Sequence, residues 1–212
     1  MMRIVWHGHS CFEIESDVTV VTDPHDGKSL GIKAPVVGPD LVLISHDHFD
    51  HNCSRALMGN FQIVRGTGDV EVKGVRIRGL EAYHDDDEGK KRGKVTIYRF
   101  ELEGVSFCHL GDLGHPLSDE QLEAIGRVDV LFIPVGGIFT IDGKEARATV
   151  ERIRPRVAIP MHFRMGGLSL SIQTVDAFLE GLPESALFRV GNEMDVFPEE
   201  LPSETEYWVF SP

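Results

Sequence analysis

The stretch that decides the fold is Ser45-His46-Asp47-His48-Phe49-Asp50-His51, which directly follows the apolar run Leu41–Ile44. A short uninterrupted apolar run is typical of a strand buried on both faces. Residues two apart on an extended chain point to the same side, so His46 and His48 can converge on one ion. Three histidines and two aspartates within six residues are hard to explain as core residues or helix caps.

A turn after this strand would carry Asp50 and His51 to a second ion beside the first. Imidazole and carboxylate groups suit zinc, iron and manganese. Two ions need more ligands than this segment supplies, and His84, Asp112 and His162 each follow a predicted strand. Each of the three has another reading, as an ordinary polar residue or, for Asp112, a turn or helix cap. Together with the central motif they give seven ligands, which suffice for two metals and a shared water.

Strand-like runs dominate the first half of the chain and alternate with helical patterns in the second half. Strands are predicted over Met2–Trp6, Cys11–Glu15, Val18–Thr22, Leu41–Ile44, Phe61–Val64, Val75–Leu80, Val95–Leu102, Val105–Cys108, Val128–Ile133, Val157–Ile159, Leu187–Val190 and Met194–Phe197. Helices are predicted over Ser118–Ile125, with a capping box from Ser118 to Gln121, and over Lys144–Ile153 and Ser171–Leu179. This order predicts an α/β (α+β) fold with sheets in the middle and helices outside.

The composition narrows the class of protein and of partner. A length of 212 residues with 42% hydrophobic and 26% charged residues predicts one folded domain over residues 1–212. A formal charge of −13 argues against binding nucleic acid or anionic lipid. Three cysteines without a CxxC pair, no long apolar run and no secretory signal pattern predict a cytoplasmic protein that does not span a membrane.

The motif residues resemble the metallo-β-lactamase superfamily, through His46-x-His48-x-Asp50-His51 followed in order by His84, Asp112 and His162. Further stretches resemble the branch of L-ascorbate-6-phosphate lactonase-like metal-dependent hydrolases: Gly8-His9-Ser10, Thr22-Asp23-Pro24, Tyr83-His84, Leu110-Gly111-Asp112, Pro134-Val135-Gly136-Gly137 and Pro160-Met161-His162-Phe163. The resemblance implies a four-layer αββα sandwich with a dinuclear site. It also implies the ligand sets: His46, His48 and His84 for one ion, Asp50, His51 and His162 for the other, and Asp112 as the bridge.

This site predicts a metal-dependent hydrolase with two divalent ions, zinc first and manganese or iron as alternatives. Two close cations lower the pKa of a bridging water, and the resulting hydroxide attacks an ester, lactone or phosphodiester bond of a small molecule, with anionic molecules among the candidates. Asp50 is the predicted catalytic residue, which orients the hydroxide or shuttles a proton. The alternatives are a di-iron redox enzyme, a metal-dependent nuclease and a non-catalytic metal-binding module. The di-iron redox enzymes of this superfamily carry a glutamate where this chain has His48. The net negative charge of the chain disfavours a nuclease.

Several weaker candidates surround the motif. His9 is predicted to hydrogen-bond close to the metal ligands, and Asp23 either orients a ligating histidine or forms a turn before Pro24. Thr140 and Asp142 are candidate pocket residues. His109, His115 and Cys53 are predicted to have structural roles. The Asp85–Gly93 segment is predicted to be a solvated loop, with a loop that overhangs the site as the alternative.

Overall fold

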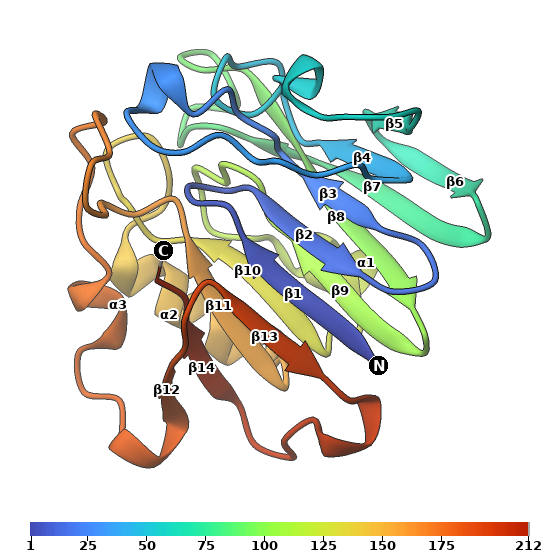
Figure 1. Cartoon of the computed structure of the whole chain (residues 1–212). Helices are drawn as coiled ribbons and strands as arrows, with labels where there is room; N and C mark the ends of the chain where they lie inside the picture. The colour runs from blue at the N-terminus through green and yellow to red at the C-terminus, as the bar shows by residue number, and fades with distance from the viewer. Residues whose placement is uncertain (212) are drawn as a thin grey trace.

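The computed structural model describes residues 1–211 as two β-sheets packed face to face (Figure 1). One sheet has six strands in the order β13-β1-β2-β3-β4-β5. Its strands are β1 (Met2–Trp6), β2 (Phe12–Glu15), β3 (Val20–Thr22), β4 (Leu41–Ile44), β5 (Gln62–Arg65) and β13 (Glu193–Val196). Strands from opposite ends of the chain meet here, because β13 pairs antiparallel with β1 and sets Met194 opposite Ile4.

The second sheet has eight strands in the order β12-β14-β11-β10-β9-β8-β7-β6. Its strands are β6 (Gly68–Val72), β7 (Val75–Tyr83), β8 (Lys94–Leu102), β9 (Val105–His109), β10 (Val130–Pro134), β11 (Val157–Met161), β12 (Leu187–Arg189) and β14 (Glu206–Val209). The run from β9 through β10 to β11 is parallel, so these three strands end at the same edge of the sheet.

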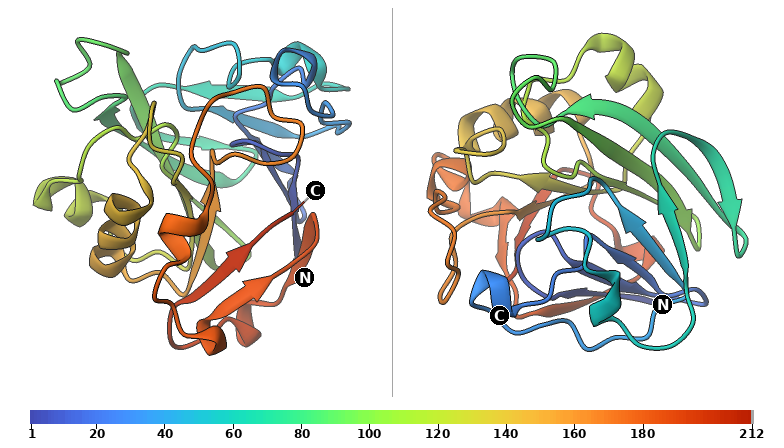
Figure 2. Two further views of the ribbon diagram at one scale, coloured as in Figure 1. Left: turned by 90° about the vertical axis from the view of Figure 1, so that its left-hand side faces the viewer. Right: turned by 90° about the horizontal axis from the view of Figure 1, so that it is seen from above.

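The helices lie on the outer face of the eight-stranded sheet (Figures 1 and 2). They are α1 (Asp119–Ile125), α2 (Gly143–Ile153) and α3 (Asp176–Leu179). The six-stranded sheet is covered on its outer face by loops that pack Val37 and Leu57 against Val42. Single turns of 3-10 helix accompany these loops and the C-terminal part: η1 (Lys28–Leu30), η2 (Ser54–Ala56), η3 (Glu184–Ala186) and η4 (Pro198–Glu200). The predicted fold class is confirmed.

The core lies between the two sheets and is rich in aromatic rings. Phe12 of β2 and Phe132 of β10 are fully buried, and their ring centroids lie 4.4 Å apart. The Phe132 ring in turn stacks on Phe107 of the neighbouring strand, with centroids 6.4 Å apart. This row of rings joins one sheet to the other and fixes the spacing between them. Within residues 1–211 no helix is long and apolar enough to cross a bilayer.

The predicted secondary structure is largely confirmed, but strands β6 and β14 were not predicted and one predicted helix is partly wrong. The capping box of Ser118 and Gln121 begins α1 as expected. The helix predicted over Ser171–Leu179 is wrong in its first half, because α3 begins only at Asp176. The backbone of Gln173 instead donates to Gly136 O and accepts from Arg164 N, so tertiary hydrogen bonds hold this segment extended.

We expect Phe132→Ala to lower the free energy of unfolding by about 3–5 kcal/mol, because it removes a buried ring that joins the two sheets. Urea denaturation at a fixed metal concentration measures this change. The control is Phe188→Ala on the edge strand β12. Phe188 is 39% exposed, so this change should lower the free energy of unfolding by only about 0.5 kcal/mol or less. Equal losses in the two variants would show that the Phe12–Phe132 contact does not join the sheets.

Candidate metal centre

The predicted ligands follow four strands and meet between the two sheets. His46 comes two residues after β4 ends, His84 directly follows β7, and His162 directly follows β11. Asp112 lies three residues beyond the end of β9, which pairs with β10 on one side and β8 on the other. The facing strand ends thus bring residues that are more than 100 positions apart into one cluster.

Asp112 lies at the centre of this cluster. Its Oδ2 atom is 3.2 Å from His51 Nε2, 3.2 Å from His162 Nε2, 3.3 Å from His84 Nε2 and 3.8 Å from His46 Nε2. The Asp112 side chain is only 3% exposed. Burial alone would raise the pKa of Asp112, but the adjacent His162 and His51 outweigh burial and hold it well below its ordinary value. A buried carboxylate anion therefore has four imidazole nitrogens converging on one oxygen.

Two groups of ligand atoms flank this carboxylate. Within each group, the atoms that can bind a metal lie within 4.8 Å of one another. One group is His46, His48 and His84, and the other is His9, Asp50, His51 and His162. These two groups contain the two ligand sets implied by the family resemblance, while a third group, Asp23, His46 and His51, overlaps both. His9 is the one addition, and it lies among the predicted ligands themselves.

Asp23 and Ser45 determine which ring nitrogen the two central histidines, His46 and His51, turn toward Asp112. Ser45 Oγ donates to Asp23 Oδ2 at 2.6 Å and lies 2.9 Å from His46 Nδ1, which can then donate to it. His51 Nδ1 donates to the same Asp23 oxygen at 3.0 Å. Both arrangements leave the Nε2 lone pair free, and the Nε2 atoms of His46 and His51 are buried without a hydrogen-bond partner. Orphaned, inward-facing imidazole nitrogens beside a carboxylate fit a bound cation.

The electrostatics of the two central histidines differ. Burial lowers the pKa of His46 to about 3, and the nearby His51 adds to this shift, so His46 is neutral and ready to bind a metal. Burial alone would also lower the pKa of His51, but the carboxylates of Asp112, Asp23 and Asp50 outweigh it and raise that pKa well above its usual value. A cation at His51 Nε2 would take the place of that proton.

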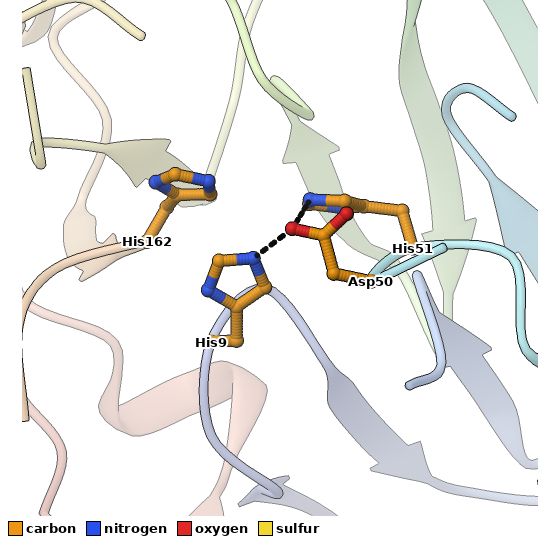
Figure 3. Close-up of side chains that lie close together, drawn as sticks. All are labelled: His9, Asp50, His51 and His162. Atoms are coloured by element: carbon orange, nitrogen blue, oxygen red, sulfur yellow. Dashed lines mark hydrogen bonds and ion pairs between the residues drawn. The ribbon is translucent and has the colours of Figure 1, made fainter. Parts of the chain in front are cut away.

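His9 lies in the loop between β1 and β2 and belongs to the second ligand group (Figure 3). Its Nε2 atom lies 3.1 Å from Asp50 Oδ2, and the same oxygen lies 3.5 Å from His51 Nε2. The His9 backbone has φ of 56°, a conformation uncommon for residues other than glycine, and its carbonyl accepts from His162 N. Burial alone would raise the pKa of Asp50, but the adjacent His51 and the hydrogen bond from His9 hold it well below its ordinary value.

Two glycines allow the ligand loops to approach closely. A Cβ atom at Gly136 would lie 2.1 Å from the carbonyl oxygen of His162. A Cβ atom at Gly111, whose φ is 54°, would lie 2.7 Å from the Ser45 side chain. The loops after β10 and β9 therefore touch the backbone beside the ligands, and no other residue type fits there without a shift.

The weaker candidates have structural positions. Asp142 caps α2 by accepting from Lys144 N and Glu145 N, and Thr140 Oγ1 donates to the carbonyl of Ile141. His109 lies close to the backbone, with Nε2 3.1 Å from Ser10 O and Nδ1 accepting from Gly111 N. His25 was not predicted from the sequence; its Nε2 lies 3.1 Å from His7 O, and its Nδ1 accepts from Gly27 N. Its only sequence signal was its place directly after Asp23-Pro24.

The family model of the β-lactamase superfamily domain matches residues 3–162. A UPF0173 metal-dependent hydrolase from Methanopyrus kandleri is 35% identical over 193 residues, covering 76% of this chain and 84% of that protein. The chain belongs to the UPF0173 metal-dependent hydrolases of the metallo-β-lactamase superfamily. A second such hydrolase, from Nitratidesulfovibrio vulgaris strain DP4, is 31% identical and covers 89% of this chain and 92% of that protein.

Solved structures agree with this membership in the metallo-β-lactamase superfamily. A crystal structure from Thermotoga maritima, described as a candidate Zn-dependent hydrolase of the superfamily, is 39% identical with a TM-score of 0.83. The match covers 99% of this chain and 98% of that one. The di-iron β-hydroxylase CmlA from Streptomyces venezuelae is 13% identical, with a TM-score of 0.61 over 84% of this chain and 49% of that chain, which shows a shared fold alone. The fold therefore does not by itself distinguish hydrolysis from redox chemistry.

We expect Gly136→Ala to lower the metal content per chain and to destabilise the protein by about 1–3 kcal/mol, since the new methyl group must displace the backbone of His162. Elemental analysis and thermal unfolding measure the two effects. In the control, Gly191→Ala, the added Cβ has no atom within 4 Å, so metal content should not change. Full metal content in Gly136→Ala would mean that the close approach to His162 does not position this ligand.

Proposed function

We propose that this chain is a dinuclear hydrolase that cleaves an ester, lactone or phosphodiester bond of a small molecule. The observation that carries the proposal is the position of Asp112, whose single oxygen Oδ2 lies within 4 Å of imidazole nitrogens from both ligand groups. A carboxylate shared between two cations reduces their mutual repulsion, which is large at short separation in a shielded site. One carboxylate beside a single ion would not need ligands on both sides.

The two ions would be held by the groups that flank Asp112. His46, His48 and His84 form one set, and Asp50, His51 and His162 form the other. Bound there, the cations supply a lowered pKa for a shared water and stabilisation of the developing oxyanion. The imidazole-rich donor set favours zinc, with manganese or iron as the alternatives.

Asp50 is the proposed catalytic residue, and His9 is its positioning residue. Asp50 Oδ2 accepts from His9 Nε2 at 3.1 Å, so this oxygen is held in place within the second ligand group. A carboxylate fixed beside the reacting water can orient it and take up its proton. Asp23 would act one step farther away, by holding the His51 ring through Nδ1.

The competing functions have less support. The histidine at position 48 lies in the first ligand group, whereas the redox relatives considered above carry a glutamate there. The formal charge of −13 disfavours a nuclease, because phosphate backbones are bound by net positive surfaces. We further propose that the enzyme works in the cytoplasm as one domain over residues 1–212.

The variant Asp112→Asn tests the shared carboxylate with little change in side-chain volume. We expect metal content to fall from two ions per chain toward one, because the negative charge between the sites is lost. Hydrolysis of bis(4-nitrophenyl) phosphate and of a chromogenic lactone should fall by roughly a hundredfold or more. Elemental analysis, circular dichroism and turnover of the metal-reconstituted protein measure these effects.

The matched control is Asp47→Asn in the same motif. The Asp47 side chain is 83% exposed and contacts Asn52 and Arg65 rather than the ligands, so its loss should leave metal content and turnover unchanged. Turnover of either substrate by wild type should also disappear with a chelator and return with zinc or manganese. Two ions and near-normal turnover in Asp112→Asn would contradict the bridging role. Reductant-dependent oxygen consumption without hydrolysis would favour the redox alternative.

A further inference from the structure

The loop from Asp85 to Gly93 is tightly built around one buried carboxylate. Asp85 is only 3% exposed. Its two oxygens accept four backbone N–H groups at 2.7–3.0 Å, from Asp87, Gly89, Lys91 and Arg92. The carbonyl of Gly93 accepts from His84 N at 3.0 Å. The prediction of a merely solvated loop is therefore incomplete, because the loop is fixed to the backbone of a proposed metal ligand.

Arg92 differs from the other two cations of this loop. Lys90 pairs with Asp87 at 2.9 Å, and Lys91 pairs with Asp86 at 2.7 Å. Over the part of the chain that the structure describes, no carboxylate lies within ion-pair distance of the Arg92 guanidinium, and this group makes no side-chain hydrogen bond. The guanidinium instead lies over the Phe139 ring, 5.4 Å from its centroid. This contact orients the cation and leaves its N–H donors available.

The contact between Arg92 and Phe139 joins loops on both sides of the metal centre. Arg92 belongs to the loop between β7 and β8, and Phe139 lies in the loop after β10. β9, which leads to Asp112, lies between β8 and β10 in the sheet. The loop after β10 also contacts His162 through Gly136. The Arg92 side chain therefore connects two of the loops at the sheet edge at which the proposed ligands gather.

The loop after β10, which contacts Arg92 through Phe139, has a strained backbone that hydrogen bonds hold in place. Ile138 has φ of 29°, an outlier for a β-branched residue, and it is 57% exposed. Ile141 N donates to Leu113 O at 2.8 Å, and Gly137 N donates to Ile141 O at 3.2 Å. Strain of this kind persists where the surroundings overdetermine the backbone, and it is concentrated at functional sites.

We propose that Arg92 is a specificity-determining residue that binds a negatively charged oxygen group of the substrate, such as a carboxylate or a phosphoryl group, away from the bond that is cleaved. The proposal rests on the hydrolase function given above. A planar guanidinium presents paired N–H donors that match the oxygens of such anions. Because the protein has a formal charge of −13, the binding of an anionic substrate depends most on a cation such as Arg92, which pairs with no carboxylate among the described residues.

Two matched esters test the proposal on the metal-loaded full chain: 4-nitrophenyl butyrate, which is neutral, and the 4-nitrophenyl half-ester of succinate, which replaces the terminal methyl group by a carboxylate. We expect Arg92→Gln to lower kcat/KM for the succinate half-ester by about tenfold or more, as expected for loss of a hydrogen bond between charged groups. The value for butyrate should change by less than about twofold. Arg92→Lys, which keeps the charge without the paired donors, should lie between Arg92→Gln and wild type.

Lys91→Gln is the matched control, because it removes a cation of the same loop that is already paired with Asp86. We expect it to behave as wild type on both esters, and all variants to retain the wild-type metal content. An equal loss on both esters in Arg92→Gln, or a loss in Lys91→Gln as large as in Arg92→Gln, would overturn the proposal.

A binding measurement separates this proposal from the hydrolase function itself. Inorganic phosphate and succinate should each raise the unfolding temperature of wild type, and Arg92→Gln should reduce at least one of these rises. The anion whose effect falls more identifies the group that Arg92 binds. If wild type hydrolyses neither ester but Arg92→Gln still weakens anion binding, the proposed function fails for these esters while the assignment of Arg92 stands. The assignment of Arg92 would be contradicted if neither anion raised the unfolding temperature of wild type, or if both anions raised that of Arg92→Gln by as much as that of wild type.

Discussion

The structure depends on one constraint, the burial of the Asp112 carboxylate between the two sheets. An anion in this position is costly unless opposite charge compensates it. Imidazole nitrogens of four histidines lie within 4 Å of its Oδ2 atom. The pKa of His51 is raised by the three carboxylates of Asp112, Asp23 and Asp50 together, so a single proton there supplies only part of the compensating charge. Cations bound on both sides would provide the compensating charge. The same two cations would therefore offset the cost of burying Asp112 and supply the proposed metal chemistry.

The sandwich serves this constraint by bringing strand ends together. β4 belongs to one sheet, and β7, β9 and β11 belong to the other, so ligands from distant parts of the sequence meet between the two layers. Hydrogen bonds then orient the rings, as Asp23 does for His51. The rings of Phe12 and Phe132 hold the sheets at a fixed separation, on which the ligand distances depend.

Much of this arrangement was predictable from the sequence because the strongest signals are local. Leu41–Ile44 is a buried strand, and the histidines that follow it enter the cluster as their spacing indicates. Tertiary interactions were harder to predict. The segment before Asp176 has helical spacing but is held extended by hydrogen bonds to Gly136 and Arg164, and the membership of His9 in a ligand group depends on a contact across 41 positions. No local pattern reports such contacts.

The most direct test of a metal pair bridged by Asp112 is a crystal structure of the reconstituted protein, with anomalous difference maps measured at the absorption edge of the added metal. We predict two peaks, one on each side of Asp112. One should lie beside His46, His48 and His84, and the other beside Asp50, His51 and His162. A single peak, or peaks that do not contact Asp112, would contradict a carboxylate-bridged pair and with it the proposed mechanism.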